Sequence, residues 1–164
     1  MLRGSMAAGF WLYGWRQVPT HALVLGQRAA ATRPEIEQIM LSAPDGLDGE
    51  ELERALYLLR RRIEARATAS GLQHFYICSL SARSVIYKGM MLAQALADFY
   101  PDLNDPRVEA NVALFHQRYS TNTFPEWRLA QPFRMLAHNG EINTLRGNAS
   151  WMRSHEIRMT AEAF

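Results

Sequence analysis

The sequence predicts an α+β fold, in which helices and strands occupy separate stretches of the chain. One segment, at residues 48–67, has apolar residues at helical spacing. Two short runs, at 74–80 and 84–88, are rich in β-branched and aromatic residues instead. With 164 residues, 48% hydrophobic content and 21% charged content, the chain has the size and composition of one globular domain.

The clearest element is a helix predicted from Asp48 to about Ala67. Asp48 is a good N-cap residue, and Glu51 three positions later gives the spacing of a capping box. The apolar stripe that follows consists of Leu52, Ala55, Leu56, Leu59 and Ile63. Before this helix lie an aromatic stretch at 10–18 and a short apolar segment at 36–41, whose patterns predict no particular element.

The rest of the chain alternates between predicted strands and helices. The runs 74–80 and 84–88 are separated by Ser81, Ala82 and Arg83, which predicts a hairpin. A short helix is expected at 90–99, before Pro101, and buried strands at 108–116 and 133–138. Residues 141–159 are expected to be helical towards their end, although Gly147 disfavours an unbroken helix.

Composition excludes several classes of protein. The single cysteine, Cys78, allows no internal disulfide and no four-cysteine metal site, and it favours the cytoplasm as the compartment. His116 and His138 lack metal-ligand spacing to another ligand, so no metal site is predicted. The formal net charge of +2 calls for neither nucleic acid nor a membrane surface. No run approaches the roughly 18 apolar residues that span a bilayer.

The stretch from His116 to Trp151 carries the candidate chemistry. Arg118 lies in a polar segment, and an arginine fork can hold a carboxylate through two parallel hydrogen bonds. Asn139 and Gly140 follow an apolar segment, and an amide side chain beside a glycine N–H can stabilise a developing oxyanion. Each has a plainer explanation, because Arg118 alone could be a surface arginine and Asn-Gly is also a common turn dipeptide.

Longer motifs favour the functional interpretation of Arg118 and of Asn139-Gly140 over the plainer one. The chain reads HQRYSTNTFP at 116–125 and HNGEINTLRGN at 138–148, preceded by FYICSLS at 75–81 and YKGM at 87–90. In these motifs it resembles the class II glutamine amidotransferase domain, in the form found in glutamate synthases. The resemblance implies part of an αββα sandwich of the N-terminal-nucleophile hydrolase type. It covers residues 10–164 as a partial domain and leaves residues 1–9 unmatched.

The same resemblance implies roles for individual residues. Arg118 would hold the α-carboxylate of glutamine with Thr121 as a second contact, and Asn139 with Gly140 would form the oxyanion hole. The family's nucleophile is an N-terminal cysteine, for which this chain has no equivalent. Cys78 is not expected to replace it, because it lies in an apolar run without an adjacent base or a free α-amino group.

We therefore expect a portion of a glutaminase domain, which hydrolyses glutamine and passes ammonia on to make glutamate from 2-oxoglutarate. The chain by itself is predicted to be inactive, and the residue that binds glutamine's ammonium would lie beyond Phe164. By resemblance, FMN and an iron–sulfur cluster belong to other domains, and the partners are those domains and a small subunit. Two alternatives are a non-catalytic amino-acid-binding or regulatory module and an amidotransferase with another acceptor.

Overall fold

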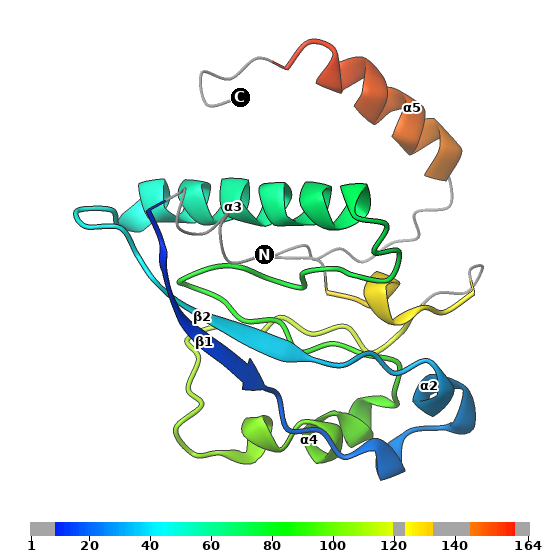
Figure 1. Ribbon diagram of the computed structural model, residues 1–164. Helices are drawn as coiled ribbons and strands as arrows, with labels where there is room; N and C mark the ends of the chain where they lie inside the picture. Colours follow the sequence, from blue (N-terminus) through cyan, green and yellow to red (C-terminus); the bar gives the residue numbers. More distant parts are fainter. Residues whose placement is uncertain (1–8, 120–123, 133–144, 160–164) are drawn as a thin grey trace.

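The computed structural model describes residues 9–119, 124–132 and 145–159, and Figure 1 shows their arrangement. The two strands, β1 and β2, lie between the long helix α3 on one side and the short helix α4 on the other (Figure 1). The strands and α-helices of the described residues are β1 (Trp11–Gln17), α2 (Gln27–Ala31), β2 (Glu37–Ser42), α3 (Gly49–Ala69), α4 (Leu96–Phe99) and α5 (Leu145–Glu156).

The strands β1 and β2 form an antiparallel pair, the sheet that the described residues contain. Trp11 pairs with Ser42 at one end and Gln17 with Glu37 at the other, with a register shift between Leu12 and Gly14. These strands come from the two stretches for which the sequence predicted no element. Their pairing joins segments about twenty residues apart, which local periodicity does not reveal.

Helix α3 confirms the helix predicted at 48–67. Its apolar stripe packs on Phe10, Leu41 and Leu80, and Leu59 at its centre is 1% exposed. Beyond its C-terminal end Gly71 adopts φ 77°, and the N–H of Leu72 donates to the carbonyl of Ala67 over 3.0 Å. The predicted capping box is wrong in its side-chain part, because the Asp48 side chain makes no capping hydrogen bond.

A second core lies on the other side of the sheet, around Phe99 and Tyr100. The Phe99 ring is fully buried and lies edge-on to Tyr100, with 4.6 Å between ring centroids, and 5.7 Å from Trp127. Val18 and Ala29 complete the buried cluster. Trp127 therefore belongs to the same core as residues about a hundred positions earlier in the chain.

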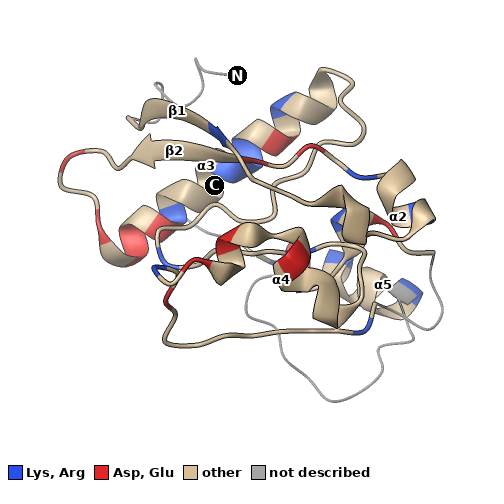
Figure 2. Ribbon diagram, turned by 90° about the horizontal axis from the view of Figure 1, so that it is seen from below, with Lys and Arg blue, Asp and Glu red and all other residues tan. Residues whose placement is uncertain are grey.

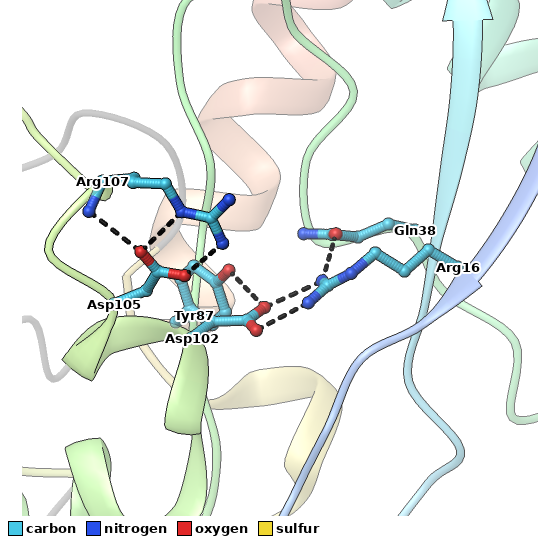
Figure 3. A network of polar contacts seen from close by, with 6 residues as sticks. All are labelled: Arg16, Gln38, Tyr87, Asp102, Asp105 and Arg107. Atoms are coloured by element: carbon cyan, nitrogen blue, oxygen red, sulfur yellow. Dashed lines mark hydrogen bonds and ion pairs between the residues drawn. The ribbon is translucent and has the colours of Figure 1, made fainter.

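A polar network ties the sheet to the 3-10 helix Pro101–Asn104 that follows α4 (Figure 3). The Arg16 guanidinium holds both carboxylate oxygens of Asp102, at 2.6 and 2.8 Å, and also donates to Gln38. The Tyr87 hydroxyl donates to Asp102 over 3.0 Å. These bonds from Arg16 and Tyr87 lower the pKa of Asp102, with the Arg16 bond as the largest cause.

Several predicted strands are wrong. Residues 74–80, 84–88 and 108–116 form no strand, because the described residues provide no backbone partner for them. The turn between the first two runs is placed as predicted, since Ser81 Oγ accepts the N–H groups of Arg83 and Ser84. The predicted strand 133–138 lies outside the described residues.

The two remaining predicted helices are confirmed in part. The one expected at 90–99 is limited to a 3-10 turn at Ala93–Ala95 followed by α4. The one expected at 141–159 is α5, and Gly147 lies inside it. From Arg146 onward, the described side chains of α5 are exposed except for Ala149.

Basic and acidic residues are interspersed along the described chain, and α3 carries residues of both signs (Figure 2). In the arginine run of α3, Arg60 and Arg61 pair with Glu64 at 3.0 and 2.8 Å. Among the described residues, no helix has the length and apolar character needed to cross a bilayer.

Candidate functional site

Arg118, the predicted carboxylate-binding residue, lies in an exposed segment without regular secondary structure. None of the described acidic residues forms an ion pair with it, whereas Arg16, Arg83 and Arg107 each hold a carboxylate. An arginine that binds a ligand carboxylate must have its N–H donors available, because a bidentate pair uses two of them. The exposed Arg118 side chain meets this requirement.

The residue after Arg118 is anchored to a turn that we call the Trp127 turn, residues 126–130. The Tyr119 hydroxyl accepts the N–H of Glu126 over 2.7 Å and donates to the Glu126 carbonyl over 3.1 Å. The turn contains the 3-10 helix Trp127–Leu129, closed by a hydrogen bond from the N–H of Leu129 to the Glu126 carbonyl. Tyr119 therefore connects the Arg118 segment to a regular piece of backbone.

The Trp127 turn is in turn fixed to the core. The Trp127 ring is buried, and its Nε1–H donates to the carbonyl of Ala29 over 3.1 Å. The Lys88 ammonium donates to the carbonyls of Arg128 and Ala130, at 2.7 and 3.0 Å. Lys88 is itself buried, and burial lowers its pKa.

Cys78 lies on the wall of a cavity of about 560 Å³, which it shares with Tyr76, Lys88 and Ile63. Burial raises the pKa of the Cys78 thiol, with Lys88 as a smaller opposing influence. A thiol whose pKa is raised by burial is a poor nucleophile at neutral pH. Arg118 is not among the described residues that line this cavity.

The other predicted site residues, Thr121, Asn139 and Gly140, lie outside the described residues, as does His138. His116 is exposed, which differs from the buried position expected at the end of an apolar strand. Within the described ranges, no group of three or more His, Cys, Asp or Glu side chains is placed to hold a metal ion.

Sequence reasoning did not identify the support of the site, which consists of Lys88, Tyr119 and Trp127. One signal was present, because Lys88 is the only lysine among 18 basic residues and lies at the end of an apolar run. An isolated cation in such a place often has a specific buried partner. Its partners could not be found from the sequence, since they are backbone carbonyls 40 and 42 residues later.

The sequence profile of the family "Glutamine amidotransferases class-II" matches residues 3–164. The chain is 59% identical to the glutamate synthase [NADPH] large chain of Azospirillum brasilense, over 97% of this chain and 10% of that protein. It is 48% identical to ferredoxin-dependent glutamate synthase 2 of Synechocystis, over 87% of this chain and 9% of the relative. It is 46% identical to the chloroplastic ferredoxin-dependent glutamate synthase of Oryza sativa, over 92% of this chain and 9% of that protein. The chain thus spans about a tenth of the length of these curated relatives.

Proposed function

Because this chain belongs to the class II glutamine amidotransferase family, we propose that it forms the glutamine-binding part of the amidotransferase domain of a glutamate synthase. The domain releases ammonia from glutamine, and the complete protein uses that ammonia to make glutamate from 2-oxoglutarate. The observation that carries this proposal is the 59% identity with a glutamate synthase over nearly the whole chain.

The guanidinium of Arg118, which pairs with no acidic residue in the described ranges, supports the assignment of a substrate clamp. In the proposed complex it holds the α-carboxylate of glutamine by two parallel N–H···O bonds, and the Thr121 hydroxyl adds a third. A lysine could not replace it, because an ammonium group offers no planar fork. The exposed position of Arg118 and its anchored neighbour Tyr119 make the side chain accessible on a fixed backbone.

Asn139 and Gly140 supply the second half of the chemistry in this proposal. Attack on the side-chain amide of glutamine converts its carbonyl oxygen into an oxyanion. The Asn139 amide and the Gly140 N–H donate to that oxygen, and each such donor contributes about 10²–10³ in rate. In this proposal Arg118 and Thr121 bind the substrate, and Asn139 and Gly140 stabilise the oxyanion.

The nucleophile of the proposed reaction is a cysteine outside the given sequence, with its own α-amino group as the base. Cys78 is unsuited to this role because burial raises its pKa. The 164 residues alone should therefore bind glutamine without hydrolysing it. The αββα sandwich would be completed by further strands. An iron–sulfur cluster would be held by other domains, since this chain has one cysteine, and in this proposal so would any FMN.

Steady-state glutamine hydrolysis by the intact protein that carries this chain tests the proposal. We expect Arg118→Lys to raise the KM for glutamine strongly and Asn139→Ala to lower kcat by about 10²–10³ with less effect on KM. Arg107→Lys is the matched control, because Arg107 is exposed and pairs only locally with Asp105. Wild-type kinetics in both site variants would show that these residues do not form the site.

A further inference from the structure

Lys88 is an unusual residue in this chain because its charge is buried. The side chain is 7% exposed, and the ammonium donates to two backbone carbonyls of the Trp127 turn. The ammonium also lies 5.4 Å from the centre of the Tyr76 ring. Placing an ammonium in a protein interior costs several kcal/mol before its partners compensate, and an apolar side chain of similar size would avoid that cost. The contact is therefore better explained by the geometry it imposes than by stability.

That geometry is imposed from more than one side. The Tyr100 hydroxyl donates to the carbonyl of Lys88 over 2.7 Å, which fixes the backbone from which the lysine extends. Trp127 is held by the Ala29 carbonyl, and its ring lies against Gly89. The buried ammonium therefore connects two fixed parts of the core to residues 128 and 130, and the turn has little freedom to move.

The Trp127 turn is hydrogen-bonded to Tyr119, the neighbour of the candidate carboxylate-binding residue Arg118. Both backbone polar groups of Glu126, the first residue of the turn, bond to the Tyr119 hydroxyl at 2.7 and 3.1 Å. Tyr119 is the direct neighbour of Arg118 in the chain. Lys88 and Tyr119 are therefore connected by hydrogen bonds at the two ends of the Trp127 turn and by the covalent backbone of the turn between them. All of these residues are described.

We propose that Lys88 is a positioning residue for glutamine binding, which fixes the Trp127 turn and, through Tyr119, the place of Arg118. This inference rests on the proposed function of Arg118 and deepens it. A bidentate carboxylate clamp tolerates little displacement, and misplacement by about 1 Å can cost on the order of 10²-fold. A support that lies inside the core and touches no substrate is consistent with that requirement.

The first test is the kinetics of Lys88→Met in the intact protein. We expect the KM for glutamine to rise about tenfold or more while kcat changes by less than about threefold, because binding geometry is lost and the oxyanion hole is kept. Arg107→Met makes the same chemical change at an exposed, locally paired cation and should leave both constants unchanged. A wild-type KM in Lys88→Met overturns the inference.

A second variant tests the link without touching the core. Tyr119→Phe removes only the hydroxyl that joins the Arg118 segment to Glu126, so it should raise KM in the same way. If the two residues act through one path, the double variant will have about the KM of the worse single variant. Multiplied KM effects in the double variant, or a wild-type KM in Tyr119→Phe, contradict the path.

Limited trypsin digestion provides a readout that does not depend on activity. Lys88→Met should be cut faster after Arg128, whose carbonyl loses its donor, and at the wild-type rate after the exposed Arg107. Unchanged cleavage after Arg128 contradicts the role of Lys88 in holding the turn.

The positioning role of Lys88 and the binding role of Arg118 can be tested separately. A raised KM in Arg118→Lys with a wild-type KM in Lys88→Met rejects only the positioning role. A wild-type KM in Arg118→Lys rejects the carboxylate-binding role of Arg118 on which the inference rests.

Discussion

Replacing Gly89 with alanine tests the packing of the Trp127 turn. A Cβ atom at this position would lie 2.6 Å from Cζ3 and 3.3 Å from Cε3 of the Trp127 ring, and would also meet the methyl group of Met91. The Met91 methyl is the end of a flexible side chain and can move away. The indole cannot do so easily, because its ring is buried against Phe99 and its N–H is bound to Ala29.

The expected cost follows from these contacts. Forcing one additional methyl group into a packed core costs about 1–3 kcal/mol. Displacing the indole would also break its hydrogen bond to Ala29, a loss of about 1 kcal/mol. The protein can keep the indole in place and accept the overpacking, or displace the indole, and the alternative of lower free energy will be populated. We therefore expect the folded turn to be destabilised by about 1–3 kcal/mol. That corresponds to an increase of roughly 5- to 150-fold in the population of the open turn.

Hydroxyl-radical footprinting with mass spectrometry measures the accessibility of Trp127 in the intact protein. In Gly89→Ala its modification rate should rise towards that of Trp11, which is 60% exposed. Gly26→Ala is the matched control, because a Cβ atom at Gly26 meets nothing within 4 Å and its φ of −67° suits alanine. Equal protection of Trp127 in the two variants would refute the packing argument.

Two further predictions concern titratable groups. The pKa of Asp102 is lowered mainly by its bond from Arg16, so this stabilisation is present at neutral pH and is lost as the pH falls through the lowered pKa, below about 4. Thermal unfolding between about pH 2 and 7 should therefore show a smaller acid-side loss in Asp102→Asn than in the wild type, and identical pH profiles would contradict this. The pKa of Cys78 is raised by burial, so iodoacetamide should alkylate it at least about tenfold more slowly in the native protein than after unfolding, as mass spectrometry can measure. Equal rates would instead indicate a reactive thiol.

The sequence predicted α3 well because the evidence for a helix is local. The apolar residues of one face recur every three to four positions, and burial of Leu56 and Leu59 follows from that period alone. The failure at 74–80 and 84–88 has the opposite cause. Their composition favours an extended backbone, but a strand also needs a hydrogen-bonded neighbour, and composition does not reveal one.

The same distinction applies to the site. Arg118 was predicted from a short motif, because the family pattern is continuous in sequence, and its role stays a prediction. The contact of Lys88 with Arg128 and Ala130 could not be identified, since a backbone carbonyl as acceptor places no requirement on the residue type that carries it. A short motif therefore made Arg118 a candidate, whereas the contacts that hold the Trp127 turn are found only in the structure.

The most direct test of the central claim pairs a change in the protein with a change in the substrate. The compound 4-aminobutanamide is glutamine without its α-carboxylate, and kcat/KM for both compounds can be measured with the intact wild-type protein and with Arg118→Met. If Arg118 binds the carboxylate, the wild type will prefer glutamine by about 10²-fold or more, and Arg118→Met will lose most of this preference. If Arg118→Met prefers glutamine by the same factor as the wild type, the carboxylate is bound elsewhere and the account of the site is wrong.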